Sequence, residues 1–249
     1  MELDERLLTT PPVALERCRV LTGEMADTAA KTLHDSVACL KGYSNELAAA
    51  VRKGENLTDH YEDILGTYLV KLSALRISEA DSSEAAMLLK AIGDLERIGD
   101  HGLNLAEAAQ ELQEKGIVFS DVAQRELAVL VSAVEEIVEL SFRAFRETDL
   151  QLAYQVEPLE QVIDDLKERM RRSHILRLQQ GSCSIETGFV WSDLLTGLER
   201  IGDHCSNLAG CIIDLHHHDM NTHESLRAAR VENRKFGEQY KAYAEKYHL

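Results

Sequence analysis

The sequence predicts an all-α fold of two pseudo-symmetric antiparallel three-helix bundles followed by a C-terminal helix. The 249-residue chain has only 3 prolines and 5% aromatic residues, and good helix formers such as Ala, Leu and Glu dominate it. Apolar residues recur with the spacing of amphipathic helices. The stretch LERIGDHGLNLA at 95–106 returns as LERIGDHCSNLA at 198–209. A repeat of this length, with three helices in each copy, is most simply a pair of bundles.

The first half is expected to hold three long helices. After the prolines at 11 and 12, the apolar spacing predicts one helix over about 14–51 and a second over about 55–77. A third helix is predicted over about 82–115, with a Schellman turn at Gly116.

The second half repeats this pattern. We expect helices over about 120–155, 158–179 and 189–216, with a break at the Gly- and Ser-containing segment between the last two. A capping box at 221–224 predicts a last helix that reaches about 247. The aromatic stripe of this helix is expected to pack on a bundle, with a partner-binding surface as the alternative.

These elements divide the chain into four expected parts. They are an N-terminal extension at 1–12, a first bundle at 13–117, a second bundle at 118–218 and a C-terminal helix at 219–249.

Charge and cysteine usage restrict the class of protein. The net charge of −16 makes nucleic acid an improbable partner and favours cations. The 5 cysteines are scattered without a paired spacing, which favours a reducing compartment. No segment resembles a signal peptide or a membrane span. We therefore expect a cytoplasmic location and no direct membrane span in this chain.

Acidic residues four positions apart recur at matching places in the two halves. Such residues share one face of a helix, where like charges destabilise the helix by about 0.2–0.5 kcal/mol per pair. The pairs are Glu55 with Asp59, Glu96 with Asp100, Glu160 with Asp164, and Glu199 with Asp203. A repeated repulsion of this kind indicates a compensating partner, and oxygen ligands suit magnesium, calcium, manganese or iron better than structural zinc.

The residues beside these pairs have other expected roles. Asn104 and Asn207 continue the acidic rows by one further turn and are accessory ligand candidates. His101 and His204 directly follow the second acid, about 100° around the helix, so an interhelical hydrogen bond is the favoured role. The alternative to metal binding is a solvated or salt-bridged face in which Arg97 and its repeat counterpart Arg200 pair with carboxylates of a neighbouring helix.

The doubled LERIGDH on third helices, preceded by Glu-x-x-x-Asp on second helices, resembles the PhoU family. Segments such as YEDILGTYLVKL, VEPLEQVIDDL and GFVWSDLLTGLERIGDHCSNLA are similar, more narrowly, to the PhoU-like cytoplasmic region of sodium/phosphate cotransporter family proteins. This sequence does not include the membrane-spanning carrier that normally precedes such a region.

The resemblance implies a PhoU-like pair of bundles, a role in the control of phosphate uptake and, in some members, multinuclear iron or zinc clusters at the acidic faces. It carries the ligand role onto all eight paired acids, each of which is present here. We therefore expect a metal-binding, non-catalytic regulator that acts at the cytoplasmic face on a phosphate transporter or a phosphate-signalling membrane protein. Iron, zinc, manganese and magnesium are all candidate ions, and a homodimer stays open.

Two other classes of function are weighed against this expectation. A carboxylate-bridged dimetal oxidase or hydrolase would use Glu-x-x-His rows, whereas this motif places histidine on a different face of the helix. No catalytic residues are therefore assigned. The third class is an ion-free structural adaptor held together by salt bridges of Arg97 and Arg200.

Overall fold

The computed structural model describes residues 3–216 and 235–249, together with the backbone of residue 217. All regular elements of these residues are helical, which confirms the predicted all-α class. The elements are the 3-10 helix η1 (Glu5–Thr9) and the α-helices α1 (Pro11–Lys41), α2 (Asn45–Ser73), α3 (Glu79–Lys115), α4 (Asp121–Glu147), α5 (Leu150–Gln179), α6 (Ile185–His217) and α8 (Phe236–Lys246).

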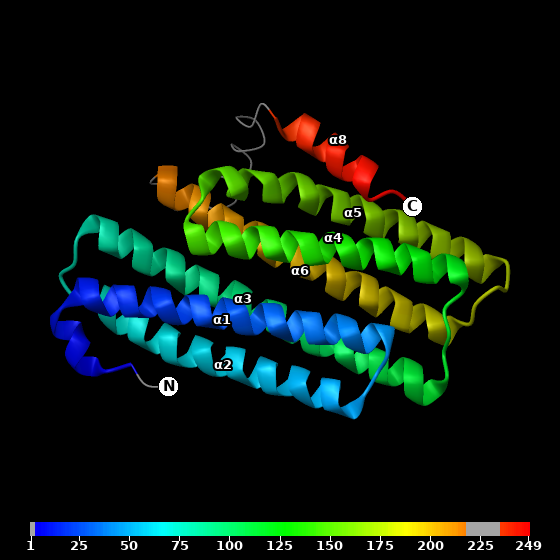
Figure 1. Cartoon of the computed structure of the whole chain (residues 1–249), viewed down its shortest axis with the longest axis horizontal. Helices are drawn as coiled ribbons and strands as arrows, with labels where there is room; N and C mark the ends of the chain where they lie inside the picture. The colour runs from blue at the N-terminus through cyan, green and yellow to red at the C-terminus, as the bar shows by residue number, and fades with distance from the viewer. Residues whose placement is uncertain (1–2, 218–234) are drawn as a thin grey trace.

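The helices form two elongated bundles that lie side by side (Figure 1). Helices α1, α2 and α3 pack on one another in the first bundle, and α4, α5 and α6 do so in the second. The two bundles meet mainly through α3 and α6, whereas α1 and α4 contact each other only slightly. The motif helix of each half therefore lies at the centre of the molecule.

The internal repeat is also a structural repeat. Glu55 of α2 corresponds to Glu160 of α5, 105 positions later, and Glu96 of α3 corresponds to Glu199 of α6, 103 positions later. Burial follows the same register, because Ser36 of α1 and its counterpart Ser141 of α4 are both fully buried. Figure 1 shows that the two copies run in opposite directions, so that α1 and α4 begin at opposite ends of the molecule.

The turn between the first two helices of each bundle lies earlier than the sequence analysis predicts. The helix predicted over 14–51 ends at Lys41, and α2 begins at Asn45 rather than near 55. Ser44 caps α2 by accepting a hydrogen bond from the Leu47 N–H at 3.1 Å. A side-chain cap at this point ends the preceding helix although the apolar spacing continues across it.

The same error occurs in the second half. Helix α4 ends at Glu147, and α5 begins at Leu150 rather than at Pro158, which lies inside α5. Thr148 adopts a positive φ of 50°, and Asp149 caps α5 by accepting from the Leu152 N–H at 3.0 Å. The predicted Schellman turn is confirmed, since Gly116 has a φ of 63° and the following N–H donates to the Leu112 carbonyl at 2.9 Å.

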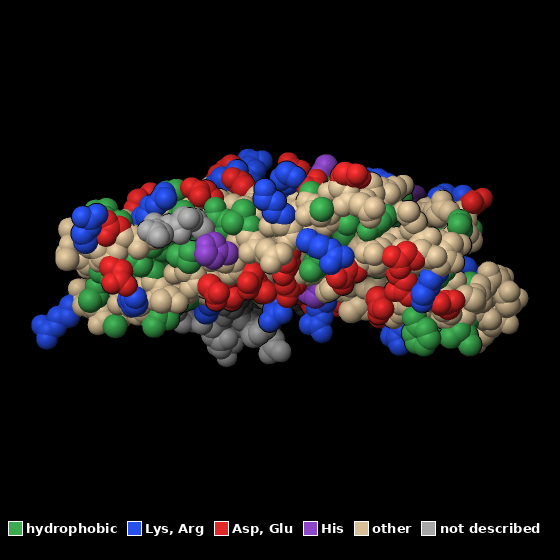
Figure 2. Space-filling view, turned by 90° about the horizontal axis from the view of Figure 1, so that it is seen from below, with side chains coloured by type: hydrophobic (Ala, Val, Ile, Leu, Met, Phe, Trp, Pro, Cys, Tyr) green, Lys and Arg blue, Asp and Glu red, His purple; other side chains and the backbone are tan. Residues whose placement is uncertain are grey.

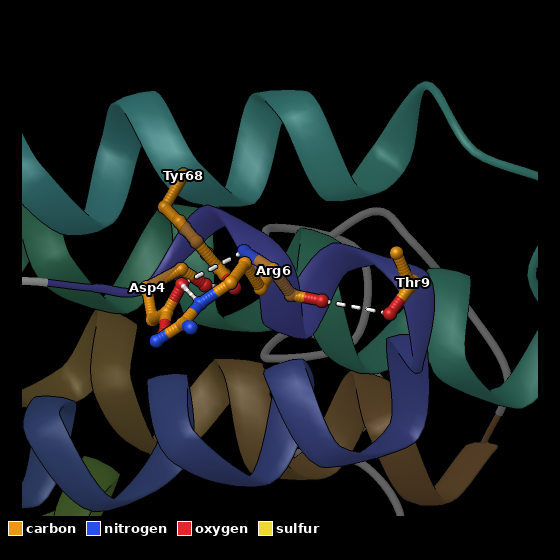
Figure 3. A network of polar contacts seen from close by, with 4 residues as sticks. All are labelled: Asp4, Arg6, Thr9 and Tyr68. Carbon is orange, nitrogen blue, oxygen red and sulfur yellow. Dashed lines mark hydrogen bonds and ion pairs between the residues drawn. The ribbon is translucent and has the colours of Figure 1, made fainter.

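The predicted N-terminal extension contains η1, which is attached to the first bundle. Asp4 caps η1 by accepting from the Arg6 N–H at 2.9 Å and also binds the Arg6 guanidinium. The Thr9 hydroxyl donates to the Arg6 carbonyl at 2.7 Å. The Tyr68 hydroxyl of α2 donates to the Asp4 carbonyl at 3.1 Å, which ties η1 to the bundle (Figure 3).

Helix α8 packs on the second bundle, as the aromatic stripe predicts. The Tyr240 hydroxyl donates to Asp165 of α5 at 2.5 Å, and Tyr247, which is buried, donates to Glu136 of α4. Lys246 pairs with the same Glu136 at 2.8 Å. The predicted capping box at 221–224 and the rest of 218–234 lie outside the described residues.

Among the described residues, none of the helices combines enough length with enough apolar character to cross a bilayer.

Candidate metal centres

The paired acids occupy facing rows on adjacent helices of each bundle. Glu55 and Asp59 lie on α2 opposite Glu96 and Asp100 on α3. In the second bundle, Glu160 and Asp164 lie on α5, and Glu199 and Asp203 on α6. Seven of these eight residues are partly buried, and Asp59 is exposed. The helical spacing therefore brings each row to the edge of a bundle core, where water screens the charges only in part.

The first bundle concentrates negative charge without a cation from the facing helix. Burial and the charges of Asp100 and of Glu62 of α2 together raise the pKa of Glu96 to about 7. Burial and the charges of Asp100 and Asp59 raise the pKa of Glu55. Because like charges resist ionisation together, this row binds protons more tightly than isolated carboxyls would. A cation would relieve the same repulsion.

Arg97 offers only partial compensation in the first bundle. Its guanidinium lies 3.0 Å from Asp100 and 3.5 Å from Glu96, and its side chain is 60% exposed. Both carboxylates are on the helix of Arg97, so the arginine does not bridge to a neighbouring helix as the salt-bridge alternative expects. Exposed pairs of this type contribute only about 0–1 kcal/mol, and the pKa of Glu96 is raised although Arg97 lowers it.

The second bundle repeats the acidic row but adds an internal cation. Burial and the charge of Glu199 raise the pKa values of Asp164 and Asp203. Lys167 of α5 lies 2.8 Å from Glu199, and both side chains are mostly buried. Lys167 stands 105 positions after Glu62, so the two bundles carry opposite charges at this position.

The charged pair at this position was not singled out by the sequence analysis. Neither Glu62 nor Lys167 belongs to the pairs of acids four positions apart on which the prediction was based. Extending the 105-residue register by two turns beyond Glu55 would have found both. The consequence is that the first row is the stronger cation-binding candidate.

Figure 2 shows acidic side chains gathered along the middle of the face seen from below, where the first bundle lies in Figure 1. Within the described parts of the chain, no three His, Cys, Asp or Glu side chains are placed closely enough to ligate one ion. Two of the acids, Asp100 and Glu199, are instead in ion pairs with Arg97 and Lys167, and like charges on one helix face repel each other. Ligation of an ion by these carboxylates therefore requires side-chain rotation, which the staggered rotamers of Glu and Asp allow.

The motif histidines lie between the bundles. The Nδ1 atom of His204 lies 2.8 Å from Asp94 of α3, and the Asn207 amide donates to the same oxygen at 3.0 Å. His101 stacks on His204 with ring centroids 5.5 Å apart. Burial and the nearby His204 lower the pKa of His101. The expected interhelical hydrogen bond is confirmed for His204, and both His204 and Asn207 are held by the opposite bundle.

The remaining accessory candidate, Asn104, is exposed one turn beyond Asp100 on α3. The eight acids thus form two rows, whereas His101, His204 and Asn207, three of the four accessory residues, lie at the contact between the bundles. Asp94 joins the bundles through one carboxylate, a role that the sequence pattern did not reveal because it depends on how α3 packs on α6.

Comparison with known proteins agrees with this arrangement. A model of the PhoU domain matches residues 22–109 and 127–212. The phosphate-specific transport system accessory protein PhoU homolog 1 of Thermotoga maritima is 30% identical over 191 residues, which cover 74% of this chain and 78% of that protein.

Two solved structures share the fold. The crystal structure of PhoU from Pseudomonas aeruginosa has a TM-score of 0.77 and 27% identity, over 82% of this chain and 97% of that one. The phosphate transport system regulatory protein PhoU from Streptococcus pneumoniae has a TM-score of 0.75 over 85% of this chain and 99% of that one, with 18% identity, and is similar in fold alone. The family match spans both bundles and both acidic rows, and the chain belongs to the PhoU family.

Proposed function

We propose that this protein is a metal-binding, non-catalytic regulator of phosphate transport. The observation that carries this proposal is the pair of partly buried carboxylate rows, repeated in register, in which burial and the charge of Asp100 raise the pKa of Glu96 to about 7. The names of the relatives, which describe accessory proteins of a phosphate-specific transport system, support the biological role.

Ion binding would act on the relative position of helices. A cation between α2 and α3, or between α5 and α6, neutralises the facing rows and stabilises the arrangement in which they converge. The free energy of binding then becomes available to shift the protein toward the state that a partner recognises. Oxygen ligands of this kind suit manganese, magnesium or iron, and the family resemblance adds zinc.

The two rows are expected to differ in affinity. Glu62 adds negative charge to the first row, whereas Lys167 already compensates Glu199 in the second. We propose that the first bundle holds the tighter site, with Glu55, Asp59, Glu96 and Asp100 as ligands. The second site requires Lys167 to turn away before an ion can reach Glu199.

The partner that we propose is a phosphate transporter or a phosphate-signalling membrane protein, contacted at the cytoplasmic face. The narrower similarity to the cytoplasmic region of sodium/phosphate cotransporter family proteins predicts a carrier encoded on the same or the adjacent reading frame. Sequencing upstream of Met1 tests that prediction. A homodimer remains a prediction that sedimentation analysis can test.

Phosphate uptake in cells tests the function. In cells that lack this protein, uptake of radiolabelled phosphate should escape its normal control when phosphate is abundant, and the wild-type chain should restore control. A chain with the four first-bundle acids changed to Gln or Asn should not restore it. Changing Glu238 and Glu245, two exposed acids of α8, to Gln is the matched control. Full control by the four-acid variant would contradict the proposal.

A carboxylate-bridged dimetal enzyme is the alternative that the acidic rows allow. Dioxygen consumption and phosphoester hydrolysis by iron- and manganese-loaded protein separate the two classes. We expect only background turnover, and turnover that disappears in the four-acid variant would favour the enzyme.

A further inference from the structure

A second polar cluster lies at one end of the second bundle, away from the acidic rows. We call it the end cluster and define it by Glu126 of α4, Ser173, His174 and Arg177 of α5, and Trp191 of α6. The Arg177 guanidinium lies 2.9 Å from Glu126, and the Ser173 hydroxyl donates to the same carboxylate at 2.7 Å.

Trp191 forms the floor of the end cluster. The Arg177 guanidinium carbon lies 5.4 Å from the centre of the indole ring, and the His174 ring lies 6.3 Å from it. Phe119, in the connection between the bundles, packs edge-on against the same indole ring, with ring centroids 5.0 Å apart. Trp191 is the only tryptophan of the chain and is 1% exposed.

The first bundle shows that the fold does not need polar groups at these positions. In the same register, Glu126, His174 and Arg177 correspond to residues 105 positions earlier, and Trp191 to the residue 103 positions earlier. These counterparts are all leucines, each at most 1% exposed: Leu21, Leu69, Leu72 and Leu88. A buried ion pair is often no more stabilising than apolar residues of similar size. Stability alone therefore does not explain why the second bundle has polar residues where the first has leucines.

A further difference between the two bundles makes room for His174. Gly188 of α6 stands where the first bundle has Ala85, 103 positions earlier. A Cβ atom at Gly188 would lie 2.8 Å from the Nε2 atom of His174. The other ring nitrogen, Nδ1, faces Cys183 at 3.9 Å, so the ring is held with Nε2 toward the interior.

Three nitrogen atoms of the end cluster lack a hydrogen-bond partner among the described residues. They are His174 Nε2, Arg177 Nη2 and Trp191 Nε1. His174 is only 9% exposed. A buried N–H that finds no acceptor costs about 1–3 kcal/mol, and such groups are rare in folded proteins. Three of them around one indole ring indicate that an acceptor from outside the protein completes the cluster.

The field at the cluster favours a negatively charged acceptor. Burial lowers the pKa of His174, and Arg177 lowers it more than Glu126 raises it. The net effect of the two charges at the imidazole is therefore positive, in spite of the ion pair between them.

We propose that the end cluster binds a small oxyanion, whose oxygens accept hydrogen bonds from Arg177 Nη2, Trp191 Nε1 and His174 Nε2. The Ser173, Cys183 and Thr187 side chains are only partly buried, and the ligand enters beside them. A compact anion such as phosphate or sulfate is the ligand that we propose. The end cluster shares no residue with the acidic rows.

Fluorescence of Trp191 reports on this site directly. The chelator-treated wild-type protein is titrated with sodium phosphate, and separately with sulfate and acetate, at constant ionic strength. We expect a saturable change with phosphate or sulfate at lower concentration than with acetate. The double variant Glu126→Leu/Arg177→Leu, which restores the residues of the first bundle, should bind at least about tenfold more weakly.

Two further variants make the test specific. His174→Leu/Gly188→Ala, which also restores first-bundle residues, should weaken binding without removing a charge. Arg171→Gln, at an exposed position of the same helix, should bind as the wild type does, and so should Glu96→Gln, which separates this site from the proposed metal function. Circular dichroism checks that each variant is folded. Absence of a saturable response in the wild type, or binding by both double variants that is as tight as that of the wild type, would overturn the proposal.

Discussion

Glu96→Gln should stabilise the metal-free protein at alkaline pH. The shift of the pKa of Glu96 from its ordinary value of 4.5 to about 7 corresponds to at most about 3.4 kcal/mol, at 1.36 kcal/mol per unit. The carboxyl is partly solvated, so screening reduces this figure, and we expect about 1–2 kcal/mol. The folded protein holds this proton more tightly than the unfolded chain does. The free energy of unfolding of the wild type therefore falls as pH rises from about 4.5 to about 7.

Thermal unfolding in the presence of a chelator measures this effect. At pH 8, Glu96→Gln should raise Tm by about 2–8 °C, and near pH 4 the two proteins should melt alike. Glu199→Gln is the matched control at the equivalent position of the repeat. It should lower Tm, because Glu199 pairs with Lys167 at 2.8 Å. A change of the same sign in both variants, or no gain for Glu96→Gln at pH 8, would refute the assignment of uncompensated charge to the first row.

Four other substitutions have defined outcomes. Gly99→Ala should lower the free energy of unfolding in urea by about 1–2 kcal/mol, because the added Cβ would lie 2.6 Å from the Thr58 hydroxyl. Gly202→Ala, whose Cβ meets only isoleucine methyl groups at 3.6 Å, should instead raise the free energy of unfolding by up to about 1 kcal/mol. If both substitutions raised the free energy of unfolding, or both lowered it, this account of the packing would be wrong. Lys167→Glu should enlarge the rise in Tm that manganese produces, and an unchanged rise would exclude ion binding at the second row. Tyr247→Phe, which loses the hydrogen bond to Glu136, should speed amide hydrogen exchange in α8 but not in α2, and unchanged exchange would show that this bond does not hold α8.

Helical periodicity predicted the class of fold and the number of helices in each bundle, but it misplaced the turn between the first two helices of both. Apolar residues continue across each turn, so spacing alone cannot mark it. The signals that do mark it are the capping side chains Ser44 and Asp149, which stand 105 positions apart. Pro158 misled the prediction because proline favours a helix start, whereas here it lies inside α5.

The acidic rows were predictable because residues four apart share a helix face whatever the tertiary structure. The surroundings of the rows were not. The pairing of Lys167 with Glu199 depends on which turns of α5 and α6 are level with each other. The capture of His204 by Asp94 depends on contact between the two bundles. The end cluster emerges only when the buried leucines of one bundle are compared with their counterparts in the other.

Metal content of the untagged protein tests the central claim most directly. The wild-type protein and the double variant Glu55→Gln/Asp100→Asn are each equilibrated with manganese, iron or zinc and then dialysed. The metal content of both proteins is measured by elemental mass spectrometry. We predict that the wild type retains a stoichiometric amount of at least one of these ions and that the variant retains clearly less. Equal retention by both proteins, or none by either, would contradict the claim that the facing carboxylates are there to hold cations.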